Sequence, residues 1–77
     1  MEDNQVSAHI KNLSAEEDRL YAKDNLTDEE VKHLHKINIE LDQYWDLLRQ
    51  RRALRDAHKN PDQAHVRPPG TVENYEQ

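Results

Sequence analysis

Apolar residues recur at helical spacing in the first third of the chain. The recurring positions are Val6, Ile10, Leu13, Leu20 and Tyr21. They stand three or four residues apart and share one side of a helix, on which Glu17 is the only polar position. Glu2 and Asp3 lie near its start, where the helix dipole favours negative charge. The pattern predicts a helix over about residues 3–23.

A longer apolar stripe follows a clear helix-start signal. Thr27 and Glu30 have the spacing of a capping box, in which each side chain bonds the backbone N–H of the other residue. Apolar positions then recur, without Gly or Pro, at Val31, Leu34, Ile37, Leu41, Tyr44, Trp45 and Leu48. Asn60 and Pro61 end the pattern, because proline disfavours helix in the residue before it. We predict a second helix over about residues 27–59.

The short link between the two helices predicts that they pack as antiparallel neighbours. The expected fold class is therefore all-α. We expect a coiled-coil-like two-helix hairpin over residues 1–59 and an extended, proline-containing tail over residues 60–77. Pairing the helices outward from the turn sets Val6 near Trp45. The same pairing predicts that Trp45 is largely buried in the seam.

The second helix carries another apolar strip, offset from the seam and formed by Tyr44, Leu47 and Leu54. Together with the seam, this strip is wider than one partner helix covers. A chain of 77 residues also builds only a thin core. We therefore expect a homodimer that forms a four-helix bundle with the second helix at its centre.

The tail contains all three prolines and the only glycine of the chain. Val66, Val72 and Tyr75 are spaced apolar residues that can serve as anchors. Asp62 and other tail acids can pair with arginines of the second helix. We predict that the tail packs, at least in part, on the end of the second helix that extends beyond the first.

Composition restricts the function classes. The chain has no cysteine, so disulfides and thiol nucleophiles are excluded. The net charge of -5 disfavours binding to a nucleic-acid backbone. No stretch approaches the ~20 apolar residues that span a bilayer, and the acidic N-terminus lacks the pattern of a secretory signal. We expect a cytoplasmic protein without membrane association.

Two stretches of the chain carry a resemblance to a known family. Residues 45–52 read Trp-Asp-Leu-Leu-Arg-Gln-Arg-Arg, and residues 60–68 read Asn-Pro-Asp-Gln-Ala-His-Val-Arg-Pro. Together they resemble Domain of Unknown Function family 2630, a family of small bacterial, mostly actinobacterial, proteins. The resemblance covers nearly the whole chain. It implies that the tail is part of the fold, and it implies no activity or cofactor.

An arginine cluster lies near the end of the second helix, at Arg49, Arg51, Arg52 and Arg55. Such a cluster can hold a phosphate or an acidic partner. Cations at a helix C-terminus also complement the dipole and pair with nearby acids. We favour this structural interpretation, because no Gly-rich loop or interleaved aromatic residues accompany the arginines.

Two further features of the sequence favour structural roles over chemical ones. Glu30 and His33 have the Glu-x-x-His spacing of di-iron bundles, but a single copy predicts no metal site. Glu17 lies on the seam, where we expect it to pair with Lys32, His35 or an arginine of a partner chain. No catalytic triad, phosphate-binding loop or dinucleotide fingerprint occurs. We therefore predict no catalytic residue and no cofactor.

The leading hypothesis is a non-enzymatic helical interaction protein, an adaptor or regulator that binds an unidentified protein partner. The candidate partner-binding residues are Arg49, Arg51, Arg52, Arg55, Leu47, Leu54, Val66 and Tyr75. One alternative is a small all-helical enzyme of the chorismate-mutase type, whose active sites are lined by arginine. Another is a nucleic-acid binder that uses the basic helix.

Overall fold

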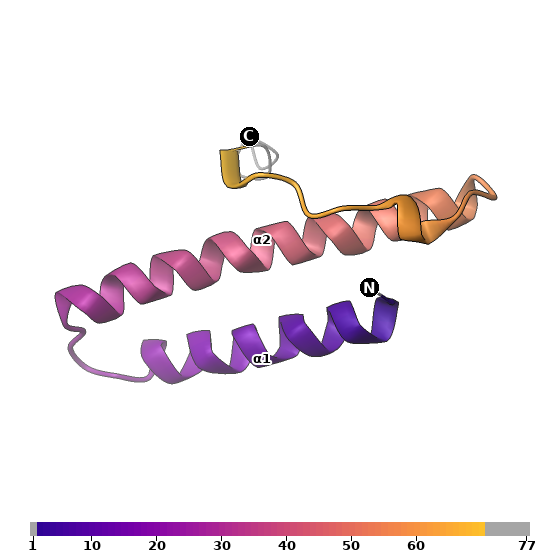
Figure 1. The fold of residues 1–77 in the computed structure, drawn as a ribbon. Coiled ribbons are helices and arrows are strands. Elements are labelled where there is room, and N and C mark those ends of the chain that lie inside the picture. The colour runs from indigo at the N-terminus through magenta and orange to yellow at the C-terminus, as the bar shows by residue number, and fades with distance from the viewer. Residues whose placement is uncertain (1, 71–77) are drawn as a thin grey trace.

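The structure is a computed structural model that describes residues 2–70. Within them the chain forms helix α1 (Asp3–Tyr21), helix α2 (Asp28–Asp56) and the short 3-10 helix η1 (Pro61–Gln63). The two long helices run antiparallel, and the chain after α2 turns back along it (Figure 1). The expected all-α hairpin is confirmed, and residues 2–70 contain no strand.

The start of α2 is set by the expected capping box. The Glu30 N–H donates to Thr27 Oγ1 at 3.1 Å, and the Thr27 N–H donates to Glu30 Oε1 at 3.0 Å. These bonds satisfy two backbone donors that have no partner inside the helix.

Both helices end before the expected residues, α1 at Tyr21 and α2 at Asp56. At the end of α2 the cause is a local cap. His58 adopts a positive φ of 60°, and its N–H donates to the Arg55 carbonyl at 2.9 Å. The Lys59 N–H donates to the Leu54 carbonyl at 2.7 Å. This pair of bonds is a Schellman motif, which reverses the chain before Pro61 is reached.

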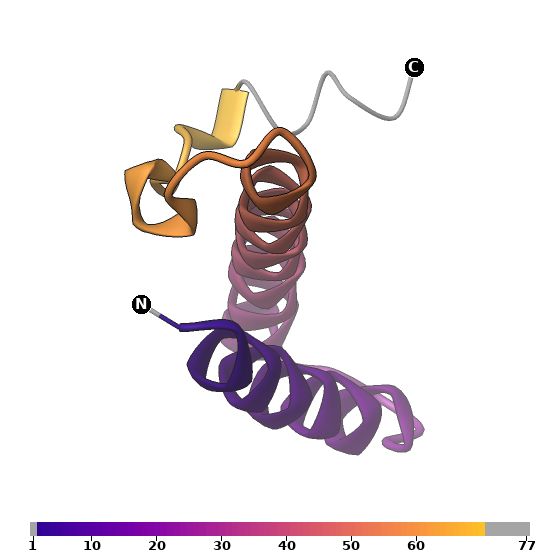
Figure 2. The same ribbon diagram turned by 90° about the vertical axis from the view of Figure 1, so that its right-hand side faces the viewer.

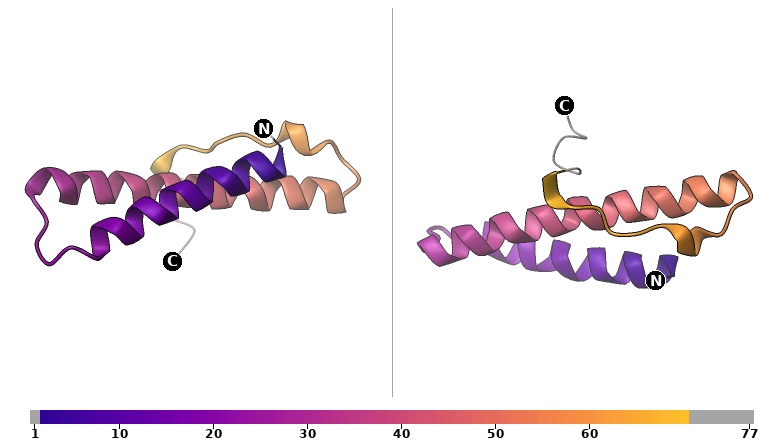
Figure 3. Two further views of the ribbon diagram at one scale, coloured as in Figure 1. Left: turned by 90° about the horizontal axis from the view of Figure 1, so that it is seen from below. Right: turned by 45° about the horizontal axis from the view of Figure 1, so that its top comes forward.

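The core is the seam between the helices. Its buried apolar residues are Val6, Ile10, Leu20, Ile37, Leu41, Leu47 and Leu48. Those of α1 follow the stripe that the sequence indicated. On α2, Ile37, Leu41, Tyr44 and Leu48 alternate steps of four and three residues and so face α1 together. Figure 3 shows that α1 crosses α2 obliquely.

Trp45 does not lie in the seam, so the expectation that it is buried is wrong. Its exposed fraction is 45%. Trp45 follows Tyr44 by one residue and is therefore turned from it by about 100° around α2. Tyr44 takes the seam position and contacts His9, with ring centroids 4.3 Å apart. Only one of the two adjacent aromatic residues can face α1.

The described part of the tail lies along α2, which confirms the expected docking for residues 61–67. Half-buried residues recur at every third position, at Pro61, Ala64 and Arg67. Ala64 packs against the core and has the dihedral angles of a polyproline-II segment, φ -67° and ψ 145°. The 3-10 helix η1 has about three residues per turn, which places Pro61 and Ala64 on the same side.

Val66 falls between these inward positions and is 46% exposed, so its assignment as an anchor is wrong. The other expected anchors, Val72 and Tyr75, lie outside the described residues. The apolar strip that we expected a second chain to cover is buried or half-buried within the single chain, and its Tyr44 packs in the seam against His9. Leu47 is buried and Leu54 is half-buried within the single chain. This strip therefore gives no argument for a dimer.

Figure 2 looks along α2 from its C-terminal end. α1 lies beneath α2, and η1 lies to one side. The opposite side of α2 is covered by neither α1 nor η1. Within residues 2–70, neither helix has the length and apolar character needed to cross a bilayer.

Candidate functional site

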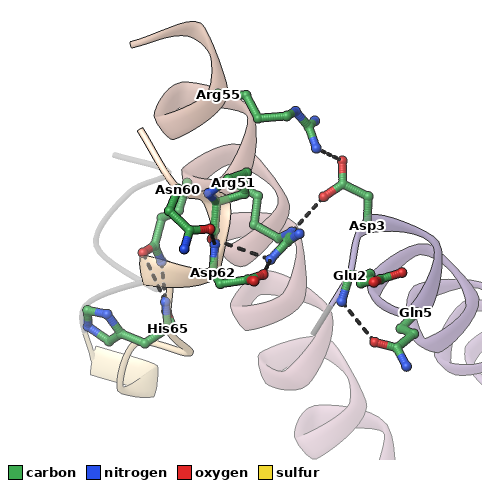
Figure 4. A network of polar contacts seen from close by, with 10 residues as sticks. Glu2, Asp3, Gln5, Arg51, Arg55, Asn60, Asp62 and His65 are labelled. Atoms are coloured by element: carbon green, nitrogen blue, oxygen red, sulfur yellow. Dashed lines mark hydrogen bonds and ion pairs between the residues drawn. The ribbon is translucent and has the colours of Figure 1, made fainter. Parts of the chain in front are cut away.

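Arg51 joins three segments that are far apart in the sequence. Its Nε donates to Asp3 Oδ1 in α1 at 2.6 Å, and its Nη1 donates to Asp62 Oδ1 in η1 at 3.0 Å (Figure 4). The same Nη1 donates to the Pro61 carbonyl at 3.3 Å. Arg51 is only 6% exposed. Its guanidinium is therefore committed to holding the start of α1 and the tail against α2.

Asp3 bridges two arginines of α2. Its second carboxylate oxygen pairs with Arg55, so one carboxylate neutralises two guanidinium groups (Figure 4). The hydrogen bond from Arg51, followed by that from Arg55, lowers the pKa of Asp3. The hydrogen bonds to Asp3 and Asp62 raise the pKa of Arg51. Both groups stay charged across the neutral range, and the attraction persists with them.

A second group of polar contacts holds the tail against the part of α2 that precedes Arg51. Gln50 Nε2 donates to the buried Asp46 Oδ2 and to the His65 carbonyl, each at 2.8 Å. Arg67 Nε lies 3.5 Å from the same Asp46 oxygen. Gln43 Nε2 donates to the Arg67 carbonyl at 3.0 Å. The buried carboxylate is thus compensated by an amide and a cation, as a buried charge requires.

The arginine cluster is divided by the structure. Arg51 is buried, and Arg55 pairs with Asp3 while remaining exposed. Arg49 and Arg52 are also exposed. Of the apolar candidates, Leu47 is buried in the core, Leu54 is half-buried, Val66 is exposed, and Tyr75 is outside the described residues. The structure therefore does not bring the candidate residues together as one exposed surface.

The acidic residue that crosses the seam is Glu16 and not Glu17. Glu16 Oε1 lies 2.8 Å from His33 Nε2 and 3.5 Å from Arg19 Nη2. The hydrogen bond with His33 lowers the pKa of Glu16. Glu17 is half-buried and has no hydrogen bond or ion pair in the described part of the chain. The expected pairing of Glu17 with Lys32 or His35 is wrong, because α1 turns the neighbouring carboxylate toward α2.

The Glu-x-x-His pair of α2 is used in two separate contacts. Glu30 closes the capping box and pairs with Lys23, while His33 contacts Glu16. Among residues 2–70, no three His, Asp or Glu side chains are placed to hold a metal ion.

An exposed strip runs along the side of α2 opposite the tail. We call it the outer face and define it by Val31, Asn38 and Trp45. The three residues are seven positions apart, which is about two helical turns, so they lie nearly in line. Val31 is 51% exposed and Trp45 is 45% exposed, while Asn38 is half-buried between them. The outer face is a second candidate site that the sequence did not identify.

The family comparison covers almost the entire chain. Residues 2–77 match the family described as Protein of unknown function (DUF2630). The chain belongs to this family. The relatives include Uncharacterized protein Rv0898c of Mycobacterium tuberculosis and Uncharacterized protein Mb0922c of Mycobacterium bovis. Each is 49% identical over an alignment of 77 positions, which covers 95% of this chain and 88% of the relative. No solved structure matches the chain.

Several residues that make these polar contacts were not identified from the sequence alone. Asp3 was assigned only to the helix dipole, and Gln43 and Gln50 had no assigned role. Both glutamines bond backbone carbonyls of the tail. Such bonds have no signature in residue spacing, because the backbone partner is present at every position. The one available signal was the four-residue spacing of Asp46 and Gln50 on the same face of the helix.

Proposed function

We propose that this protein is a non-enzymatic interaction protein, an adaptor or regulator that binds a protein partner through the outer face of α2. The observation that carries the proposal is the exposure of Trp45 on a well-formed helix. Tryptophan is enriched among the residues that contribute most to protein interfaces, and it loses little conformational freedom on binding. A helix also presents it in a fixed position.

The internal pairing of Arg51 supports a non-enzymatic role. An arginine that stabilises a reacting anion must direct its donors at the substrate. Arg51 directs its donors at Asp3, Asp62 and the Pro61 carbonyl instead. Arg55 also pairs with Asp3. These contacts favour a structural use of the cluster over the chorismate-mutase type of chemistry.

The same pairing and the net charge of -5 favour a protein partner over a nucleic acid. The proposal also places the protein in the cytoplasm. The hairpin is held by apolar contacts and ion pairs and has no cysteine, so it needs no oxidising compartment.

Photo-crosslinking in the native cell tests this proposal. Trp45 is replaced by benzoylphenylalanine, which substitutes one large aromatic side chain for another. The control carries the same crosslinker at Val66, which has nearly the same exposed fraction but lies in the tail. We expect a protein adduct at position 45 that is absent at position 66. No adduct at position 45, or the same adducts at both positions, would contradict the proposal.

A further inference from the structure

The outer face is symmetric about Asn38. Val31 precedes Asn38 by seven residues, and Trp45 follows it by seven. When two α2 helices lie antiparallel with their Asn38 residues opposite each other, Val31 of each copy faces Trp45 of the other. A two-fold interface requires this kind of self-complementary surface. Both exposed apolar side chains of the outer face then meet apolar partners.

Charges flank the outer face with opposite sign at its two ends. Asp28 lies three residues before Val31, and Arg49 lies four residues after Trp45. Both side chains are exposed. An antiparallel second copy places Asp28 against Arg49 of its partner, and the two-fold axis makes this contact twice. A parallel copy would place like charges together, so charge complementarity selects the antiparallel arrangement.

Asn38 occupies the point at which the two copies would cross. Its side chain has no hydrogen bond within the part of the chain that the structure describes. A carboxamide both donates and accepts, so two of them related by a two-fold axis can bond reciprocally. A polar residue at one such position fixes register and orientation in helical assemblies, because any shift leaves it buried without a partner.

We propose that a second copy of this chain is the occupant of the outer face, with α2 packed antiparallel on α2 and the two-fold axis at Asn38. This inference rests on the proposed function, since it names the partner. The dimer differs from the one expected from the sequence. Leu47 is buried and Leu54 is half-buried within the single chain, and the contact uses the side of α2 opposite the tail.

The first test compares two substitutions of nearly equally exposed apolar residues, Trp45→Ser on the outer face and Val66→Ser in the tail. Sedimentation equilibrium of the full chain measures the mass. We expect a dimer for the wild type and for Val66→Ser. The Trp45→Ser variant should dissociate with a dissociation constant at least about tenfold higher. Its helical circular dichroism should be retained, because Trp45 lies outside the core.

The second test exploits the predicted charge contact. Asp28→Arg and Arg49→Asp should each weaken self-association, because each places like charges together twice. An equimolar mixture of the two variants should form heterodimers, and the double variant should recover homodimers. Weak association of both singles without rescue in the mixture would reject the antiparallel arrangement. Circular dichroism of each single variant controls for changes in α2 itself.

A third test uses the absence of cysteine. The Asn38→Cys variant should be joined rapidly by a short thiol crosslinker, because the two thiols meet at the axis. Lys32→Cys, exposed on another side of the same helix, should not be joined at a comparable rate. Equal rates at the two positions would contradict the placement of the axis.

The mass and the adduct at position 45 separate this inference from the proposed function. A monomeric wild type that still forms an adduct with a different protein would overturn the dimer and leave the proposed function standing. A monomer without any adduct at position 45 would overturn both.

Discussion

The side-chain amide of Gln50 holds both backbone groups of His65. Gln50 Nε2 donates to the His65 carbonyl at 2.8 Å, and the His65 N–H donates to Gln50 Oε1 at 3.4 Å. Nε2 donates its second hydrogen to Asp46 Oδ2. One side chain therefore bonds both the N–H and the carbonyl of a tail residue, as a neighbouring strand does for an extended segment. The same side chain also bonds a buried carboxylate.

Replacing Gln50 should release the tail. Gln50→Leu removes the bonds to His65 and one donor to Asp46, which should lower the free energy of unfolding by about 1–2 kcal/mol. Amide hydrogen exchange should show faster exchange at His65 than in the wild type. Gln63→Leu is the control, because Gln63 is exposed and its side chain makes no bond in residues 2–70. Unchanged exchange at His65 would show that other contacts suffice to hold the tail.

Arg51 and Arg52 offer a matched comparison between adjacent arginines. Arg51→Met should lower the free energy of unfolding by roughly 1–3 kcal/mol, because it removes the donors that join Asp3 and Asp62. Arg52→Met should have a much smaller effect, because Arg52 is exposed. Urea unfolding followed by circular dichroism measures both. An equal decrease in the free energy of unfolding for both variants would show that Arg51 contributes only its positive charge and not its specific hydrogen bonds.

Local signals were predicted well because the interacting groups are close in sequence. Thr27 and Glu30 are three residues apart, so their capping box depends on few other parts of the chain. The seam of α1 follows likewise from the helical period. The pairing of the helices was harder to predict. Periodicity identified Tyr44 and Trp45 as apolar, but it did not determine which of them faces α1.

The offset between the helices is fixed partly by contacts between distant residues. Asp3 and Arg51 are separated by 48 positions, and their pairing aligns the start of α1 with the last turns of α2. The sequence showed four arginines as one group. It did not show that one of them is buried, because burial depends on where α1 and the tail converge. The outer face could not be identified from the sequence for the same reason. Its exposure depends on the tail, which covers one side of α2 and leaves the other side uncovered.

The cap of α2 predicts a stabilising substitution. His58 adopts a φ of 60°, a conformation that strains residues with a Cβ atom and that glycine adopts readily. His58→Gly should raise the free energy of unfolding by about 0.5–1 kcal/mol, after the greater entropy of glycine in the unfolded chain is included. Lys59→Gly should lower it, because Lys59 has no positive φ. Thermal melting distinguishes the two, and a lower melting temperature for His58→Gly would contradict this account of the cap.

The Lys23–Glu30 pair predicts how stability depends on pH. The hydrogen bond from Lys23, followed by the backbone bond from Thr27, lowers the pKa of Glu30 from 4.5 to about 2. A carboxyl group whose pKa is lower in the folded state stabilises the fold above its unfolded pKa and loses that contribution as the pH falls toward the folded value. Stability should therefore decline between about pH 4.5 and pH 2. Glu30→Gln preserves the capping bond to Thr27 and removes the charge, so its decline should be shallower, with the rest due to Asp3 and Glu16. Glu29→Gln controls for the change in net charge. Denaturant unfolding across this range measures all three proteins, and an equally steep decline in Glu30→Gln would show that the Lys23 pair does not contribute.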